Sequence, residues 1–100
     1  MQLEKLMESE IEDKLTTIPK WQLSDGKWLE REYRFLDYLN GIEFVQQIAN
    51  LSEQVNHHPF ISIDYKLVTI KLTSWHAKGL TELDFELASR FDELYLKIKT

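Results

Sequence analysis

Two adjacent histidines, His57 and His58, stand directly before Pro59 and are the residues of this chain best suited to chemistry. The unperturbed imidazole titrates nearest neutral pH, so such side chains can donate and accept protons under physiological conditions. The sequence holds only three histidines, and two of them are used here. A purely structural interpretation stays open on the tripeptide alone, because histidine and proline are both common where a helix ends.

Further side chains could complete a site around this pair. Glu53 lies four residues before His57, so the two share a face if a helix continues that far, and the carboxylate could orient an imidazole or bind a ligand amine. The alternative is an exposed carboxylate near a helix end. The segment Thr73-Ser74-Trp75-His76 ends a predicted strand, where free backbone groups can bind a planar ligand and Trp75 offers a stacking face. The alternative there is a tryptophan that covers the core beside a surface histidine.

Several other kinds of site are not indicated. Adjacent histidines tend to point apart, and no His-x-x-x-His or Glu-x-x-His spacing suggests a metal site. The chain has no cysteine, which excludes disulfides, thiolate catalysis and cysteine-bound metals. No Gly-x-Gly-x-x-Gly or phosphate-binding loop indicates a bound nucleotide.

Composition places the chain among globular proteins. Its 100 residues, 43% of them hydrophobic, are expected to form a single domain over residues 1–100. The net charge of -5 argues against binding to nucleic acid or to an anionic membrane surface. No stretch approaches the ~20 apolar residues of a membrane span, and acidic residues near Met1 do not fit a signal peptide. We therefore expect a cytoplasmic protein.

Apolar residues recur at helical spacing in three segments. The spacing predicts helices over residues 3–18, 37–56 and 83–98. Pro19 stops the first helix, and the second must end before Pro59. Thr81 and Asp84 form a loose capping box at the start of the third.

Alternating apolar and polar residues predict two hairpins. The strands are expected over residues 21–23, 28–35, 61–65 and 68–73. The Asp25-Gly26 pair is a strong hairpin signal between the first two, and a tight turn near Lys66 joins the others. Arg31 interrupts the apolar face of the second strand.

The predicted order is therefore α-β-β-α-β-β-α. Two hairpins with one-sided apolar faces predict a two-layer α+β fold, in which a four-stranded antiparallel sheet carries three helices on one face. The other sheet face is polar, so it is either hydrated or meets a polar partner. Its side chains are Glu30, Glu32, Arg34, Ser62, Asp64, Thr69 and Lys71.

Taken together, these residues resemble the pterin-4a-carbinolamine dehydratase family. The motif reads, in order, Glu53, His57-His58-Pro59, Tyr65, Trp75 and Asp84. The surrounding sequence is also similar, and the likeness extends over residues 15–95. It includes Trp21 before Asp25-Gly26, the residues Arg31, Tyr33 and Phe35, and Gly79-Leu80-Thr81 leading into Asp84-Phe85-Glu86-Leu87-Ala88. The combination is specific, although each element alone is weak.

The resemblance implies a hydro-lyase that dehydrates 4a-hydroxytetrahydropterin (4a-hydroxytetrahydrobiopterin) to quinonoid dihydropterin and so recycles tetrahydropterin for aromatic amino acid hydroxylases. It implies no cofactor and no metal. It also implies homodimers joined edge to edge through their sheets, often paired into tetramers through helices. The pterin substrate would be the small-molecule partner.

The resemblance also implies roles for individual residues. His57 is the principal acid–base group, and His58 holds or protonates the departing hydroxyl. Glu53 accepts hydrogen bonds from the amino-pyrimidine edge of the pterin. The backbone of Thr73 and Ser74 binds the other edge, Trp75 can stack on the ring, and Asp84 binds substrate or caps the last helix.

One departure from the family concerns Trp75, because the best-known members carry a third histidine at this position. The indole N–H donates but cannot exchange protons as a base. His76 is the obvious substitute, yet neighbouring strand residues face opposite sides. We therefore hypothesise that His57 and His58 carry the reaction without it.

Two other functions remain open from the sequence. Proteins with this fold also act by binding other proteins, as a dimerisation cofactor of a homeodomain transcription factor or as an assembly chaperone. Such a role would use the helical face or a sheet edge and would need no histidine pair. A role linked to folate or molybdopterin is a third possibility, since the sequence does not identify the pterin.

Overall fold

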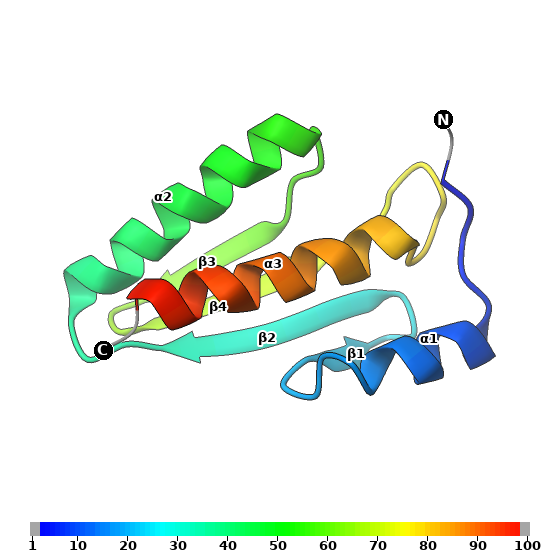
Figure 1. Ribbon diagram of the computed structural model, residues 1–100, viewed down its shortest axis with the longest axis horizontal. Helices are drawn as coiled ribbons and strands as arrows, with labels where there is room; N and C mark the ends of the chain where they lie inside the picture. The colour runs from blue at the N-terminus through cyan, green and yellow to red at the C-terminus, as the bar shows by residue number, and fades with distance from the viewer. Residues whose placement is uncertain (1–2, 99–100) are drawn as a thin grey trace.

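Helices and hairpins alternate along the chain and build two layers (Figure 1). The computed structural model describes residues 3–98. Its elements are α1 (Glu8–Leu15), β1 (Gln22–Ser24), β2 (Trp28–Arg34), α2 (Tyr38–Val55), β3 (Phe60–Asp64), β4 (Leu67–Leu72) and α3 (Glu82–Ile98). Their order confirms the prediction of an α-β-β-α-β-β-α chain with an α+β fold.

The four strands form one sheet in the order β1-β2-β4-β3, and every neighbouring pair is antiparallel. β2 and β4 meet at its centre, where Arg31 lies opposite Ile70. Asp25 and Gly26 connect β1 to β2 with φ angles of 54° and 71°, the left-handed values that a tight hairpin turn requires. Tyr65 was predicted to end a strand but lies in the β3–β4 turn with φ at 57°.

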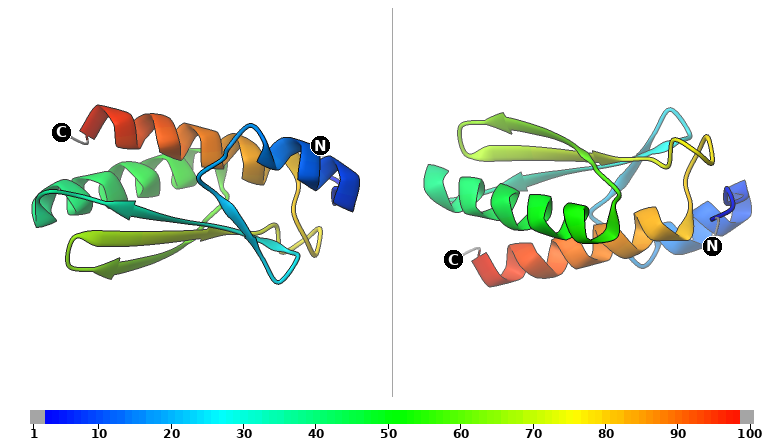
Figure 2. Two further views of the ribbon diagram at one scale, coloured as in Figure 1. Left: turned by 90° about the horizontal axis from the view of Figure 1, so that it is seen from below. Right: turned by 90° about the horizontal axis from the view of Figure 1, so that it is seen from above.

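One face of the sheet is apolar, and the helices cover it. α2 and α3 lie side by side across this face, and α1 lies on the same side near the start of α3 (Figure 2). The prediction of three helices on one face is therefore confirmed. The two layers share a core of fully buried side chains, among them Leu29, Tyr33, Phe44, Ile48, Val68, Ile70, Leu72, Leu87 and Phe91.

The first helix is shorter than the predicted span of residues 3–18. The backbone N–H of Leu6 donates to the carbonyl of Leu80 at 2.8 Å, so this part of the chain is bound to a distant segment instead of to its own helix. The N–H of Met7 donates to the Glu10 side chain at 2.8 Å, which caps the helix where it begins. Leu6 therefore fits the helical spacing but is buried from a segment that precedes the helix.

Arg31, which broke the apolar alternation of β2, forms an ion pair inside the fold. Its Nη1 donates to Oδ1 of Asp92 on α3 at 2.7 Å. The same oxygen accepts the indole N–H of Trp21 at 3.0 Å and the hydroxyl of Tyr33 at 2.5 Å. Burial, and then the hydrogen bond to Asp92, raise the pKa of Tyr33 well above its usual range. This carboxylate therefore joins α3 to β2 and to the segment before β1.

We expect Asp92→Asn to lower the free energy of unfolding by roughly 1–3 kcal/mol, because it removes the counter-charge of a largely buried guanidinium and leaves only a neutral amide oxygen as the shared acceptor. Glu82→Gln is the control, since it breaks an exposed pair between Glu82 and Lys14 of 2.9 Å and should cost less than ~1 kcal/mol. Urea unfolding followed by tryptophan fluorescence measures both. Equal losses in the two variants would contradict the role given to Asp92.

Candidate active site

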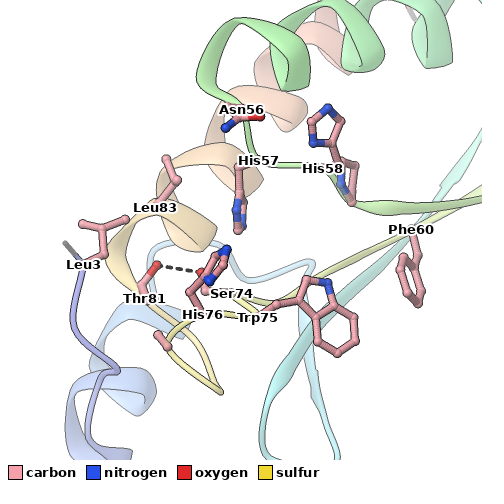
Figure 3. A pocket seen from close by; sticks show the side chains of 12 residues that line it. Leu3, Asn56, His57, His58, Phe60, Ser74, Trp75, His76, Thr81 and Leu83 are labelled. Atoms are coloured by element: carbon pink, nitrogen blue, oxygen red, sulfur yellow. Dashed lines mark hydrogen bonds between the residues drawn. The ribbon is translucent and has the colours of Figure 1, made fainter. Parts of the chain in front are cut away.

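A hollow of about 670 Å³ lies where the end of α2, the start of α3 and the turn after β4 meet (Figure 3). Its volume is within the range of small-molecule sites. The lining combines imidazole, hydroxyl and aromatic groups. It consists of Leu3, Asn56, His57, His58, Pro59, Phe60, Ser74, Trp75, His76, Ala77, Thr81 and Leu83.

The end of α2 directs the two histidines into this hollow. Asn56 adopts the left-handed conformation, with φ 54° and ψ 46°, and its N–H donates to the carbonyl of Glu53 at 3.4 Å. The N–H of His57 donates to the carbonyl of Ser52 at 3.1 Å, which completes a common helix-ending motif. α2 ends at Val55, before His57, so Glu53 and His57 do not share a helical face. The helix does not continue far enough for the contact that their spacing allowed.

His57 is held by a buried carboxylate. Its Nε2 lies 2.7 Å from Oδ1 of Asp84, whose side chain is 0% exposed, whereas the His57 side chain is 15% exposed. A carboxylate only accepts hydrogen bonds, so Nε2 carries the proton and donates it. None of the described residues hydrogen-bonds to Nδ1 of His57, which leaves this nitrogen available to a ligand.

The other oxygen of Asp84 is bound to the scaffold. Oδ2 accepts the hydroxyl of Ser74 at 2.7 Å and the backbone N–H of Thr81 at 2.9 Å, so the expected capping contact is present. The position of Asp84 in the first turn of α3 also favours a negative charge. Asp84 does not line the hollow and lies behind His57. Its geometry suits orienting the imidazole rather than touching a ligand.

His58 and Glu53 form a second pair, at the rim. Nε2 of His58 lies 2.6 Å from Oε2 of Glu53, and their side chains are 54% and 78% exposed. Exposed pairs of this kind contribute little to stability. His58 lines the hollow, but Glu53 does not. The carboxylate therefore restrains His58 and lies just outside the hollow.

The chain after β4 forms a tight turn. The backbones of Ser74 and Gly79 exchange hydrogen bonds of 3.1 and 3.3 Å, and Lys78 adopts φ 62°. Trp75 and His76 therefore belong to a turn, where strand alternation does not apply. His76 lines the same hollow as His57 (Figure 3), so the expectation that it faces away is wrong.

Thr73 and Phe60 also differ from expectation. The hydroxyl of Thr73 donates to the carbonyl of Lys27 at 2.6 Å, and Thr73 does not line the hollow. Phe60 does line it and was missed, although an aromatic residue on a strand face shared with Ser62 and Asp64 is a usable signal. Of the predicted residues, the hollow brings together His57, His58, Ser74 and Trp75, while Glu53, Thr73 and Asp84 lie around it.

Residues 3–98 contain no group of three or more histidine, cysteine, aspartate or glutamate side chains placed to hold a metal ion. Over the same range, no helix combines the length and apolar character needed to cross a membrane.

Comparison with known proteins connects this geometry to a family. Residues 4–94 match the family model described as pterin 4 alpha carbinolamine dehydratase. A protein of Picosynechococcus sp., provisionally named pterin-4-alpha-carbinolamine dehydratase, is 39% identical over 90% of this chain and 97% of its own length. A protein of Chloroflexus aggregans with the same provisional name is 41% identical, with coverages of 90% and 96%.

Two solved structures extend the comparison. The transcriptional coactivator/pterin dehydratase of Brucella melitensis superposes with a TM-score of 0.88 at 30% identity, covering 92% of this chain and 99% of that one. A pterin dehydratase-like protein, described as a RuBisCO assembly factor in the alpha-carboxysome, gives a TM-score of 0.63 at 26% identity, with coverages of 75% and 86%. The overall arrangement is thus shared with proteins described in two different ways.

We expect Asp84→Asn to release the His57 ring, because an amide at this site must present a hydrogen-bond donor either to His57 or to the groups on Ser74 and Thr81. Imidazole ¹⁵N chemical shifts should report a changed tautomer of His57, and unfolding should become easier by roughly 1–3 kcal/mol. Glu53→Gln, at an exposed pair, is the matched control and should leave the His57 signals unchanged. Identical His57 signals in wild type and Asp84→Asn would refute the orienting role.

Proposed function

Since this chain belongs to the pterin 4 alpha carbinolamine dehydratase family, we propose that it dehydrates a 4a-hydroxytetrahydropterin to quinonoid dihydropterin. The observation that carries this proposal is the imidazole of His57 on the wall of the hollow, bound at 2.7 Å to the buried carboxylate of Asp84. The second ring nitrogen of His57 is left for proton exchange. A separate reductase must then reduce the quinonoid dihydropterin before the tetrahydropterin can again serve as a hydroxylase cofactor.

The reaction requires two coordinated proton movements. A ring nitrogen of the substrate loses a proton, and the bond from the neighbouring carbon to the hydroxyl breaks. The hydroxyl leaves as water once it has received a proton, so one proton is taken up and one is given back. Each positioned proton transfer contributes typically ~10²–10⁴-fold to the rate.

His57 is the principal acid–base group in this proposal. The hydrogen bond from Nε2 to Asp84 fixes which nitrogen carries the proton, and Nδ1 of the neutral ring is then an acceptor. An imidazolium formed after proton uptake would be stabilised by the ionised Asp84. This arrangement of an imidazole oriented by a buried carboxylate is a recurrent one in acid–base catalysis.

The other histidines would assist the second of the two proton movements, the protonation of the departing hydroxyl. His58, restrained by Glu53 at 2.6 Å, holds or protonates the departing hydroxyl at the rim. His76 lines the same hollow, and we assign it an auxiliary role that the sequence alone did not favour. Trp75, which cannot act as a base, stacks on the pterin ring.

The remaining candidate residues are considered as ligands for the two edges of the pterin. Glu53 uses one oxygen for His58 and has a second oxygen to accept the amino group of the pyrimidine edge. The N–H and the carbonyl of Ser74 already pair with Gly79, and Thr73 does not line the hollow, so we assign the other edge to neither backbone. Asp84 acts on the substrate only through His57.

We expect His57→Ala to reduce turnover of authentic 4a-hydroxytetrahydropterin by about 10²–10⁴-fold, while His76→Ala loses on the order of tenfold. Trp75→His should retain turnover, because it adds an imidazole beside the hollow. Stopped-flow absorbance measures the rates, and unfolding curves confirm that each variant is folded. If His76→Ala abolished activity and His57→Ala did not, the assignment of the principal base would be wrong.

A second candidate function is non-catalytic protein binding. It is favoured by the two solved structures, one described as a transcriptional coactivator/pterin dehydratase and one as an assembly factor. Such a role needs no imidazole in a hollow. Turnover by the wild-type chain separates the two: a folded protein with no rate above the uncatalysed background would leave the binding role as the better explanation.

We also propose that the chain forms homodimers, or tetramers built from them, through the edge of β3. This outer strand has exposed apolar residues, Phe60 and Ile63, and a free edge is a site for pairing with another strand. Ile63→Lys should shift the mass measured by light scattering towards the monomer, whereas Lys66→Ala in the adjoining turn should not. An unchanged mass for Ile63→Lys would exclude this edge.

A further inference from the structure

A second cavity of about 290 Å³ adjoins the hollow. It is lined by Lys27, Trp28, Thr73, Ser74, Trp75, Lys78 and Gly79. Ser74 and Trp75 line both cavities, so the indole of Trp75 stands at the boundary between them. A ligand that places a flat ring in the hollow can therefore extend a substituent past Trp75 into the second cavity.

Two exposed lysines line the second cavity, although the chain as a whole is acidic, with a net charge of -5. Lys27 and Lys78 line it, and Nζ of Lys71 lies 4.7 Å from the ring centroid of Trp28 at its edge. Within residues 3–98, none of these three ammonium groups is within 4.0 Å of a carboxylate. Glu30 lies opposite Lys71 in the sheet but forms no ion pair with it.

The walls of the second cavity suit an extended, partly flat ligand. Trp75 is 62% exposed and meets Trp28 edge to face, with ring centroids 5.4 Å apart. Phe60 packs against both indoles, with ring centroids 6.0 Å from Trp75 and 5.1 Å from Trp28, and it borders the hollow (Figure 3). Exposed aromatic rings beside unpaired ammonium groups form a surface for a ligand that is planar at one end and anionic at the other.

We propose that the second cavity is a subsite for an anionic substituent, carboxylate or phosphate, of the pterin bound in the hollow. The inference rests on the proposed function and narrows its substrate class to pterins with a negatively charged tail. Lys27 and Lys78 would attract the anion, and Trp75 would lie between ring and tail. At separations near 4 Å, an unpaired lysine contributes about fivefold to affinity even at the dielectric constant of water.

The test compares oxidised pterins by quenching of tryptophan fluorescence at low salt. The probes are 6-hydroxymethylpterin, its phosphate, pterin-6-carboxylate and folate, which separate neutral from anionic tails, phosphate from carboxylate, and short from long. We expect at least one anionic probe to bind tenfold or more tightly than the neutral one. High salt should reduce this preference, because it screens exposed charges.

The variant Lys27→Gln/Lys78→Gln should remove the preference for the anionic probe and leave the affinity for 6-hydroxymethylpterin within twofold of wild type. Lys20→Gln is the control, because Lys20 lines neither cavity. Equal affinity for all four probes, or the same loss for neutral and anionic probes in the double variant, would overturn the subsite.

The outcomes also separate this inference from the function on which it rests. Turnover of a neutral 4a-hydroxytetrahydropterin without any preference for anionic tails would refute the subsite and keep the dehydratase. Failure of every probe to bind, together with the absence of turnover, would refute both. A preference that the double variant retains would place the anion elsewhere and would also overturn the subsite.

Discussion

The carboxylate of Asp84 is the interaction on which the candidate site depends. It is fully buried, and its two oxygens serve different parts of the molecule: one receives the imidazole of His57, and the other receives Ser74 and Thr81. A buried charge is tolerated only when hydrogen bonds replace its hydration. The groups that satisfy Asp84 therefore become fixed with respect to one another. The ends of α2, β4 and the start of α3 meet in one arrangement for this reason.

Two backbone turns also determine the shape of the hollow. Asn56 and Lys78 both adopt left-handed conformations, with φ of 54° and 62°, at the two reversals that flank the hollow. The first directs the histidine pair away from α2, and the second closes the turn that carries Trp75 and His76. Left-handed backbone is costly for residues other than glycine, and asparagine is among the better tolerated. The hollow is thus shaped by two local deviations from regular structure, held by hydrogen bonds at their ends.

Periodicity predicted the fold because most side chains obey it. The alternation of Val68, Ile70 and Leu72, all fully buried, reports a strand with one face against helices. The pairing of Arg31 with Asp92 could not be read from the sequence, since it joins residues far apart in the chain. A charged residue on an apolar strand face does, however, signal that a buried partner exists.

The site was less predictable than the fold. Residue types identified His57 and His58, but the partner of each imidazole depends on where α2 ends, and Asn56 ends it earlier than Pro59 requires. His76 was misplaced because strand alternation was extended into a turn. Local spacing describes regular elements well, whereas functional groups here sit on the irregular segments between them.

The segment before α1 packs against one wall of the candidate site. Leu6 donates to the carbonyl of Leu80, and a side chain at Gly79 would collide with Lys5, so the opening segment of the chain covers the turn that follows β4 (Figure 1). A peptide spanning residues 53–84 would hold all three histidines and Asp84 and would still lack this contact. The hollow consequently depends on a contact between residues that are far apart in the sequence. Such contacts form at an entropic cost, because a long loop must close first. The hollow is therefore complete only once the segment before α1 has docked on the turn after β4, more than 70 residues further along the chain.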